Sequence, residues 1–352
     1  MSDGVLAAEV SDLPLGELIR LATLRPLSTV EAERAFGEVM EGRATPVQMA
    51  ALLVAIRVRG AVPEEVAGGV RALRRAMIPV PVESAEGLVD TCGTGGGALT
   101  TFNISTAAAL VAAGAGVRIA KHGNRSFTSR CGSADVLEAL GVRLELTPEQ
   151  EARVLEQAGI VFMFAPLHHP AMRHVGPVRR ELGMPTLMNV LGPLTNPAMA
   201  RRQVVGVSDP ALLELIAGGL RELGYQRALV AHGEPGMDEL SPIGRTAVIE
   251  LRDGELTRRT LDPREELGWE VPDAQGLGGA DPEANARTVE RVLRGRERGA
   301  ARAAVALNAG AAIYVAGAAD SLRDGVARAE AALESGAGWE RLLALRAATR
   351  GG

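Results

Sequence analysis

Aromatic residues are scarce in this sequence: they make up 3% of its 352 residues, although hydrophobic residues as a whole make up 47%. A core with so little Phe, Tyr and Trp must be filled by Ala, Val, Leu and Ile. That composition favours a helix-rich α/β protein over a β-sandwich, and the high hydrophobic content excludes a disordered chain. The length predicts two domains.

Cysteine is scarcer still, since only Cys92 and Cys131 are present. Two cysteines without metal-ligand spacing predict neither a disulfide framework nor a zinc site, and reduced thiols indicate a cytoplasmic protein. The first residues include acids and no apolar run, so no signal peptide is expected. The Ala-rich stretch 300–316 is interrupted by Arg302 and Asn308 and is too short to span a bilayer. It predicts a buried core helix and no membrane partner.

An excess of basic charge is also missing. The formal net charge is −5, and no long basic run occurs. Charge therefore gives no indication of a nucleic-acid partner. It leaves open a local basic pocket for a small anion.

The first eighty residues predict helices and little strand. Ser28 and Thr45 are each followed three positions later by Glu or Gln, which is the spacing of a capping box, and Pro63 fits the first turn of a third helix. The run 49–58 is apolar on most sides, which predicts a buried helix that ends at Gly60. These features indicate a small helical domain followed by a connector.

From Gly87 onward, short β-branched runs alternate with helical patterns, which is typical of a largely parallel sheet covered by helices. Strands are expected at 88–90, 117–120, 160–164, 203–207 and 227–231, and a hairpin at 246–251 and 256–260. Helices are expected at 106–113, 134–140, from 147, and at 210–223, and three helical stretches are expected in the C-terminal quarter. The predicted fold class is α/β, with a small helical N-terminal domain and a larger α/β domain.

A glycine-rich loop after the first expected strand is the most informative segment. Four of five positions are glycine: Gly93, Gly95, Gly96 and Gly97. Without side chains, backbone N–H groups can approach a ligand closely. Ser105 and Thr106 are expected to cap the next helix, whose free N–H groups would face an anion. The segment is neither a Walker A loop nor a dinucleotide fingerprint; it predicts a phosphate or diphosphate cradle, with a tight ligand-free turn as the alternative.

Polar residues follow the next expected strand, at the end where open α/β sheets bind ligands. Lys121 offers a point charge for phosphate, and Asn124 offers both a donor and an acceptor for a substrate amine or hydroxyl. Ser129 and Ser133 are neutral donors for phosphate oxygens. The alternative is a solvated basic loop.

Two further features carry candidate chemistry. The adjacent carboxylates Asp238 and Glu239 suit magnesium, which takes one or two carboxylates together with substrate phosphates and water, although a solvated acidic turn is the alternative. Arg179 is a candidate for binding a carboxylate through two parallel hydrogen bonds, although an Arg on a helix is more often a surface cation.

The sequence contains one histidine cluster, formed by His168, His169 and His174. Its spacing favours packing and hydrogen bonding over metal ligation.

Together these segments resemble anthranilate phosphoribosyltransferases, the enzymes of the second step of tryptophan biosynthesis. The matching motifs are CGTGGG with TFNIST, KHGNR with GSAD, VRRELG with NVLGPLTNP, and MDELSPIGRT, in the family's order from Asp90 to Thr246. The resemblance implies a homodimer. It also implies a helical domain of residues 1–84 with a returning segment at about 173–200, an α/β domain of residues 85–172 and 201–352, and an active site at the hinge.

The same resemblance implies the substrates phosphoribosyl diphosphate and anthranilate, with Mg²⁺ as cofactor. Contacts to phosphoribosyl diphosphate are implied for Gly93, Gly96, Asn103, Ser105, Thr106, Lys121 and Ser133. Magnesium would be held, directly or through water, by Ser105, Asp238 and Glu239. Anthranilate would be contacted by Asn124 and, on its carboxylate side, Arg179; with Lys121 these form the expected catalytic set. The expected substrate-binding set is completed by Gly97, Thr101, His122, Gly123 and Ser129.

One departure from the family is Gly97, because the glycine loop commonly ends in Asp. Losing a carboxylate there would weaken the attraction for magnesium and reduce repulsion toward the phosphates, so we expect a functional enzyme with altered magnesium dependence. Two alternatives to the transferase are a pyrimidine-nucleoside phosphorylase and a non-catalytic relative that binds nucleic acid. KHGNR and NVLGPLTNP favour the transferase over the first. The intact glycine loop, Lys121, the Asp238–Glu239 pair and the negative net charge without a basic stripe argue against the second.

Overall fold

Sequence-encoded caps start the N-terminal helices. The computed structural model of the protein describes residues 13–126, 130–270 and 273–351. Four helices open the described chain: α2 (Leu15–Leu24), α3 (Thr29–Met40), α4 (Pro46–Arg59) and α5 (Pro63–Ala76). The capping boxes predicted at Ser28 and Thr45 are both present. Each box satisfies two backbone N–H groups that a helix start leaves unpaired, so these positions fix where α3 and α4 begin.

Helix α4 is buried on one face, so the expected burial of this helix is confirmed for that face and not for the opposite one. Its inward face is formed by Met49, Leu52, Leu53 and Ile56. Val47 and Val58, in contrast, are 78% and 82% exposed. Helical spacing places Val47, Ala51, Val54 and Val58 on one face, which we call the α4 stripe. The helix is apolar on most sides because this second apolar face lies at the surface of the chain.

A seven-stranded sheet forms the centre of the remaining described chain. Its strands are β1 (Val89–Gly93), β2 (Ile119–Gly123), β3 (Ile160–Phe164), β4 (Arg202–Gly206), β5 (Arg227–Gly233), β6 (Thr246–Arg252) and β7 (Glu255–Leu261). The strand order is β3-β2-β1-β4-β5-β6-β7. Strands β1 to β5 are parallel and β6 and β7 are antiparallel additions, which confirms the predicted fold class. The chain runs outward from β1 to β3 and then continues on the other side of β1, so the topological switch point lies between β1 and β4.

The helices that follow β1 confirm most expected positions. They are α6 (Ile104–Gly114), α7 (Ser133–Ala139), α8 (Pro148–Ala158), α9 (Ala165–His168), α10 (Met172–Leu182), α11 (Met188–Leu191), the 3₁₀ turn η1 (Gly192–Leu194), α12 (Leu212–Glu222), α13 (Pro263–Leu267), α14 (Pro282–Leu293), α15 (Gly299–Val315), α16 (Leu322–Glu334) and α17 (Ala337–Arg350). The C-terminal region holds four long helices, α14 to α17, rather than the three expected. None of the described helices is long and apolar enough to cross a membrane.

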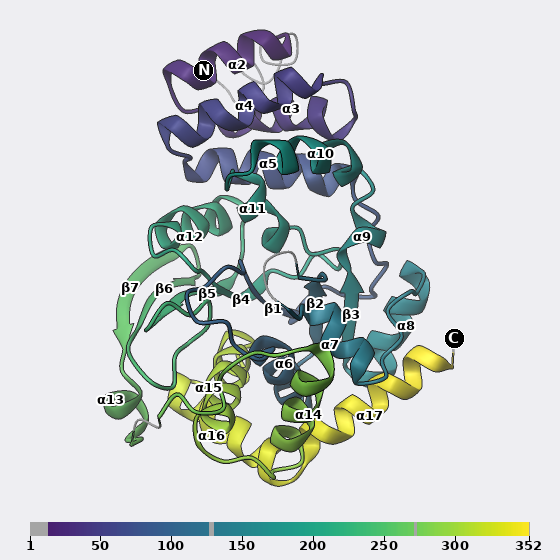
Figure 1. Ribbon diagram of the computed structural model, residues 1–352, viewed down its shortest axis with the longest axis vertical. Helices are drawn as coiled ribbons and strands as arrows, with labels where there is room; N and C mark the ends of the chain where they lie inside the picture. Colours follow the sequence, from purple (N-terminus) through teal and green to yellow (C-terminus); the bar gives the residue numbers. More distant parts are fainter. Residues whose placement is uncertain (1–12, 127–129, 271–272, 352) are drawn as a thin grey trace.

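The helices are arranged in layers around the sheet (Figure 1). Helices α2 to α5 and α10 form the upper layer of the view, and α6 and α14 to α17 lie below the sheet. Neighbouring strand residues divide between the two faces: Val204 packs into the lower core and Val205 into the core shared with the upper helices. Helix α5 contacts α12 closely, because a Cβ atom on Gly219 would lie 2.6 Å from Cγ1 of Val66. This contact seats the upper helices on the sheet.

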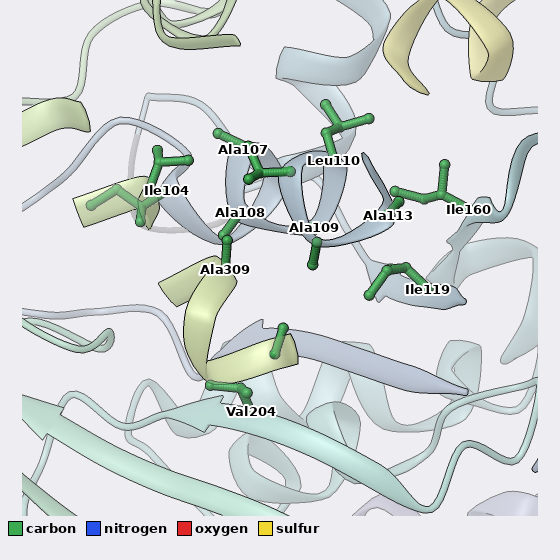
Figure 2. Close-up of a cluster of buried hydrophobic side chains, with 14 of the residues drawn as sticks. Ile104, Ala107, Ala108, Ala109, Leu110, Ala113, Ile119, Ile160, Val204 and Ala309 are labelled. Carbon is green, nitrogen blue, oxygen red and sulfur yellow. The ribbon is translucent and has the colours of Figure 1, made fainter. Parts of the chain in front are cut away.

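The lower core is built largely from alanine (Figure 2). Helix α6 is buried along almost its whole length, with Ala107, Ala108 and Ala109 fully enclosed. Figure 2 shows Ala309 of α15 beside α6. Small side chains allow the helix axes to approach closely at the density of a packed interior. The predicted burial of the Ala-rich stretch is confirmed in α15.

Candidate active site

The glycine loop follows β1 at the switch point of the sheet. Its Thr94 N–H donates to the carbonyl of Gly206 at the end of β4, at 2.9 Å. The hydroxyl of Thr94 accepts from the N–H of Ser208 at 3.1 Å. Gly95 and Gly96 have φ of +72° and +79°, in the left-handed region that favours glycine. The loop is therefore fixed between the carboxyl ends of β1 and β4, where such sheets bind ligands.

The segment that carries Asp238 and Glu239 lies directly against glycines at three strand ends. A Cβ atom on Gly93 would lie 2.3 Å from Oδ2 of Asp238, and one on Gly206 would lie 1.5 Å from its carbonyl oxygen. A Cβ atom on Gly233 would lie 2.5 Å from the carbonyl oxygen of Glu239. Strands β1, β4 and β5 thus end in glycine because the carboxylate segment occupies the space of the missing side chains. Sequence reasoning missed Gly206 and Gly233, since neither stands in a glycine-rich run.

The carboxylate segment also contacts the glycine loop. Oδ2 of Asp238 accepts a hydrogen bond from the N–H of Gly95 at 2.8 Å. Gly97 lies close by, since its Cβ atom would be 2.8 Å from the carbonyl oxygen of Gly236 and 3.5 Å from Oδ1 of Asp238. An Asp at position 97 would therefore point a third carboxylate at this segment and would require the backbone at Gly236 to move.

The structure brings the three predicted metal ligands together. Ser105, Asp238 and Glu239 line one enclosed space of about 10 Å³, which is room for about one water molecule. Nζ of Lys121 donates to Oγ of Ser105 at 3.3 Å. Oγ1 of Thr101 donates to the Glu239 carboxylate at 3.2 Å. Residues from β1, β2, α6 and the segment after β5 therefore meet at one point.

Burial controls the charges at this point. It raises the pKa of Asp238, and burial together with the charge of Asp238 raises the pKa of Glu239 well above its ordinary value. Burial also lowers the pKa of Lys121, although Asp90 and Glu239 oppose that change. Two crowded carboxylates with a hydroxyl beside them are hard oxygen donors, and this set fits a magnesium ion. In the described part of the chain no three His, Cys, Asp or Glu side chains are placed to hold a metal, so further oxygens would have to come from substrate and water.

Lys121 is held by the protein itself. Its side chain is only 3% exposed, and besides Ser105 its Nζ donates to the carbonyl of Thr91. An ammonium group has three N–H donors, so one more acceptor can be served without breaking either bond. The position suits a charge that is fixed before a ligand arrives.

A buried carboxylate beneath the loop was missed by sequence reasoning. Asp90 accepts from Nδ2 of Asn196 at 2.8 Å and from the N–H of His122 at 3.2 Å. Burial raises its pKa to about 6, although Lys121 and the two donors act in the opposite direction. Asn196 also donates to the carbonyl of Ala120 at 2.8 Å. Asp90 and Asn196 together connect the segment before β4 to β1 and β2. The sequence signal that could have identified Asp90 is an acid within an apolar strand pattern.

The expected histidine cluster separates into two roles. His168 is buried and hydrogen-bonds through Nδ1 to the carbonyl of Ile78 at 2.8 Å and through Nε2 to Glu151 at 3.0 Å, which confirms a packing role for this residue. His169 instead faces the candidate residue His122, with 3.2 Å between the two Nε2 atoms. Burial lowers the pKa of His122 well below its ordinary value and that of His169 to about 4. At neutral pH the two rings can therefore share one hydrogen bond without charge.

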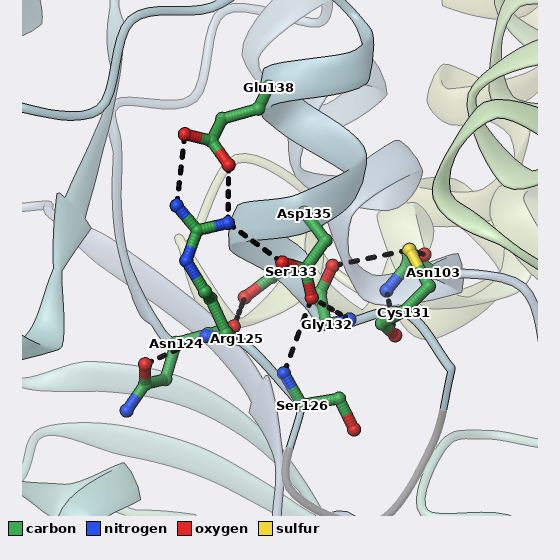
Figure 3. A network of polar contacts seen from close by, with 9 residues as sticks. All are labelled: Asn103, Asn124, Arg125, Ser126, Cys131, Gly132, Ser133, Asp135 and Glu138. Atoms are coloured by element: carbon green, nitrogen blue, oxygen red, sulfur yellow. Dashed lines mark hydrogen bonds and ion pairs between the residues drawn. The ribbon is translucent and has the colours of Figure 1, made fainter.

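The loop after β2 places Asn124 beside the start of α7 (Figure 3). The carbonyl of Asn124 accepts from Oγ of Ser133 at 3.3 Å and from the N–H of Ala134 at 3.2 Å. A side chain at Gly123 would displace its neighbours, because its Cβ atom would lie 2.3 Å from Oγ of Ser133 and 2.7 Å from Cε2 of Phe162. The candidate residue Ser129 lies outside the described residues.

Helix α6 begins two residues earlier than expected, so the prediction that Ser105 and Thr106 cap it is wrong. Asn103 occupies the cap position, and its side chain does not bond the helix start. Nδ2 of Asn103 donates to the carbonyl of Cys131 at 3.2 Å, and its Oδ1 accepts from Asn285 at 3.0 Å. The helix thus begins directly after Asn103. Ser105 and Thr106 therefore lie in the first turn of α6 rather than before it.

Arg179 stands apart from the other candidates. It lies in α10, which packs against α3 and α4, and it is half-buried. Burial lowers the pKa of its guanidinium. Within the described residues, no hydrogen bond or ion pair joins it to the glycine loop, Lys121 or the carboxylate segment.

Asn308 of α15 is a further residue that sequence reasoning did not assign to the site. Its Oδ1 accepts from the N–H of Leu240 at 3.0 Å and its Nδ2 donates to the Leu240 carbonyl at 2.9 Å. It thereby holds the backbone next to Glu239 from below. A single amide in an Ala-rich stretch was the signal that could have identified it.

Comparison with known proteins assigns this arrangement to a class of transferases. The model of the glycosyl transferase family α/β domain matches residues 85–339, and the model of the helical bundle domain of the same family matches residues 17–77. The fold and its two domains are therefore those of the glycosyl transferase family.

Similar proteins of known identity define the family within these transferases. The anthranilate phosphoribosyltransferase of Rubrobacter xylanophilus is 56% identical over 92% of this chain and 94% of its own length. The crystal structure of the enzyme of that name from Thermus thermophilus has a TM-score of 0.89 at 46% identity and covers 95% of this chain and 99% of its own. A Saccharomyces cerevisiae anthranilate phosphoribosyltransferase in complex with PRPP and Mg has a TM-score of 0.83 at 26% identity, over 92% and 94% of the two chains. The chain belongs to the anthranilate phosphoribosyltransferase family.

Proposed function

We propose that the chain transfers the 5-phosphoribosyl group of phosphoribosyl diphosphate to the amine of anthranilate. The products are N-(5-phosphoribosyl)anthranilate and diphosphate, and the reaction is the second step of tryptophan biosynthesis from chorismate. The observation that carries the proposal is the meeting of the glycine loop, Lys121 and the Asp238–Glu239 pair at the switch point of the sheet. Family membership supplies the identity of both substrates.

The diphosphate is placed at the glycine loop and Lys121. Backbone N–H groups of the loop can point at phosphate oxygens where no side chain intervenes, with Gly93 and Gly96 as the expected contacts. Lys121, already oriented by Thr91 and Ser105, supplies a fixed positive charge that stabilises the departing diphosphate. Asn103, Thr106 and Ser133 complete the expected contacts to this substrate.

Magnesium is placed on the carboxylate pair, with Ser105 beside it. When bound, the ion would neutralise charge that develops on the leaving diphosphate. Asp238 and Glu239 support this role because two buried carboxylates lie beside each other and beside the hydroxyl of Ser105, which is a set of hard oxygen donors. The yeast relative, which was solved with PRPP and Mg, supports the same cofactor.

Anthranilate is placed between Asn124 and Arg179. The amine of an aromatic ring is a poor nucleophile, so substitution at the ribose C1 develops positive charge on the sugar before the new C–N bond is complete. Asn124 holds the amine on the face of the sugar opposite the diphosphate, and Arg179 receives the carboxylate in a two-point contact. Positioning of this kind can supply several kcal/mol, up to about 7–11 in favourable cases.

A direct assay separates this proposal from the phosphorylase alternative, which the comparisons do not favour. Purified protein is mixed with Mg²⁺, phosphoribosyl diphosphate and anthranilate, and the loss of anthranilate fluorescence is followed. A parallel reaction contains thymidine and inorganic phosphate. Consumption of anthranilate alone supports the transferase, whereas thymine release with no loss of anthranilate would establish the phosphorylase.

A homodimer in the cytoplasm is part of the proposal. The α4 stripe supports the dimer, because a row of exposed apolar side chains on one helix is typical of a protein contact. We expect Val58→Glu to shift the protein toward monomer in sedimentation velocity, with Arg57→Glu on the neighbouring exposed position as the control. The two cysteine thiols, Cys92 and Cys131, fit a reducing compartment.

The proposed domain division follows the packing. We assign residues 1–84 and the returning segment at about 173–200 to a helical domain, and residues 85–172 and 201–352 to the α/β domain. The packing of α10 against α3 and α4 supports the return of the chain to the helical part. The site would then lie between the two parts, with Arg179 on one side and Lys121 on the other.

A further inference from the structure

The two ends of the loop between β2 and α7, at Ser126 and Gly132, lie close together, and we call this contact the neck of the loop. Gly132, at its far end, lies so close to the near end that a Cβ atom on it would be 2.4 Å from the nitrogen of Ser126. Oδ2 of Asp135 accepts from the N–H of Gly132 at 2.8 Å and from the N–H of Ser126 at 3.4 Å. One carboxylate on α7 therefore binds both ends of the loop.

Arg125 fastens the same neck from outside (Figure 3). Its Nη1 lies 2.9 Å from Oδ1 of Asp135, and its Nη2 donates to Glu138 at 3.0 Å. A second bond from Nη1 to Glu138 makes that contact bidentate. The guanidinium also lies 5.4 Å from the centre of the Phe164 ring on β3. Arg125, which directly follows Asn124, is thus held by two carboxylates one helical turn apart and by the face of an aromatic ring.

We propose that Arg125 is a positioning residue for the substrate site, acting through Asn124 and Ser133 at the neck of this loop. The inference rests on the proposed function, in which those two residues contact the substrates. Asn124 has little freedom once Arg125 is fastened, because its carbonyl is bound by α7 and its Oδ1 accepts from the N–H of Arg125 at 2.7 Å. The guanidinium is directed at α7 and β3, so its charge is balanced by the protein rather than by a substrate phosphate.

The competing role, a direct phosphate ligand, makes the opposite prediction for Glu138. If Arg125 acts by positioning, Glu138→Gln loosens it and impairs catalysis. If Arg125 binds phosphate itself, Glu138 competes for the guanidinium, and Glu138→Gln improves the affinity for phosphoribosyl diphosphate. The two roles therefore differ in the sign of one measured effect.

The experiment compares Arg125→Gln, Glu138→Gln and the double variant in the full-length protein, with Arg118→Gln as the matched control. Arg118 also pairs with a surface carboxylate, Glu156, and bonds a backbone carbonyl, but it lies at the opposite end of β2. We expect kcat/KM to fall about 10-fold in Arg125→Gln. It should fall by a smaller factor in Glu138→Gln, which leaves the contact of Arg125 with Asp135, and the double variant should match Arg125→Gln because Glu138 acts on the site through Arg125. Arg118→Gln should retain parental kinetics, and Arg125→Lys should be intermediate because it keeps the charge and loses the bidentate geometry.

Two results would overturn the positioning role. One is an unchanged or improved kcat/KM in Glu138→Gln beside a loss in Arg125→Gln; the other is parental kinetics in both variants, with or without a lowered melting temperature, which marks a contact that does not position the site. An active parent with unaffected variants removes this inference and leaves the proposed function standing. A parent that neither binds phosphoribosyl diphosphate in calorimetry nor consumes anthranilate removes both.

Discussion

The carbonyl oxygen of Asp238 occupies the place where a side chain of Gly206 would begin, since a Cβ atom on Gly206 would lie 1.5 Å from it. No rotation of a flexible group can relieve that overlap, because both partners are backbone. Gly206→Ala must therefore push the Asp238–Glu239 segment off the strand ends. We predict a loss of kcat/KM of at least about 100-fold, in line with the cost of misplacing reacting groups by roughly 1 Å.

The control for Gly206→Ala is Gly16→Ala, at a helical position with open space around it. Both variants are examined by circular dichroism, so that a loss of activity in a folded protein can be recognised. Parental kcat/KM in folded Gly206→Ala would show that the position of the carboxylate segment is unimportant.

Removing the charge of Glu239 should affect metal binding and stability in opposite directions. Glu239→Gln keeps an acceptor for Thr101 but removes a carboxylate whose pKa is raised by burial and by Asp238. We predict that it weakens Mg²⁺ binding about 10-fold or more. It should also raise the unfolding free energy of the metal-free protein at pH 7, because the buried charge is removed. Calorimetric titration and thermal unfolding measure the two effects. A loss of both affinity and stability would contradict the inference that the buried carboxylates of Asp238 and Glu239 destabilise each other in the absence of metal.

Gly97→Asp should change the magnesium dependence of the reaction. The new carboxylate would begin close to Asp238 and add attraction for a divalent ion, while its Cβ atom meets the carbonyl of Gly236 at 2.8 Å. Gly97→Ala carries the same steric cost without charge and is the matched control. We predict a lower half-saturating Mg²⁺ concentration in Gly97→Asp than in Gly97→Ala. Superimposable magnesium titrations of the two variants would remove the role given to this position.

The contribution of Asp90 to the stability of the metal-free protein should fall as pH rises from 5 to 7, whereas His122 and His169, whose pKa values are lowered, contribute in the opposite direction. Asp90 has a folded pKa of about 6, above its ordinary value, so the folded state binds its proton more tightly than the unfolded state does. That contribution is complete at low pH and is lost as pH rises through 6, by about 1 kcal/mol across this window. Carboxylates with lowered pKa, such as Glu31 at about 2, are ionised in both states above pH 5 and contribute no slope there.

Denaturant titrations at several pH values measure this slope. Relative to the parent, Asp90→Asn should lack this loss, so its stability should change more favourably between pH 5 and 7; it should also be less stable throughout, because its amide presents a donor to the donor groups of Asn196 and His122. A slope in Asp90→Asn equal to that of the parent would assign the pH dependence to other groups.

Local signals were sufficient for much of the fold. Strand β3 was predicted at its observed bounds, because an apolar run follows Gly159, which ends α8 in the left-handed region. The hairpin of β6 and β7 was predicted from Asp253-Gly254, and both residues adopt the positive φ that its turn requires. Caps, glycine turns and apolar periodicity act over a few residues, so they can be interpreted without the tertiary structure.

The site was only partly predictable, because its geometry depends on contacts between distant segments. The motifs identified Lys121 and the carboxylate pair, but nothing local shows that Gly206 must lack a side chain for Asp238. The hydrogen bond between His122 and His169 and the support of Leu240 by Asn308 join segments 47 and 68 positions apart. The true start of α6 was missed for a related reason: the turn at Asn103 is fixed by Cys131 and Asn285, which come from elsewhere in the chain.

Isothermal titration of the protein with phosphoribosyl diphosphate tests the central claim most directly. With Mg²⁺ in excess, we predict saturable binding that is strongly weakened in Lys121→Met and in the double variant Asp238→Asn, Glu239→Gln. It predicts near-parental binding in Arg118→Gln. Absence of any binding heat in the parent at several temperatures, or equal binding in all four proteins, would contradict the assignment of the glycine loop, Lys121 and the carboxylate pair as the diphosphate site.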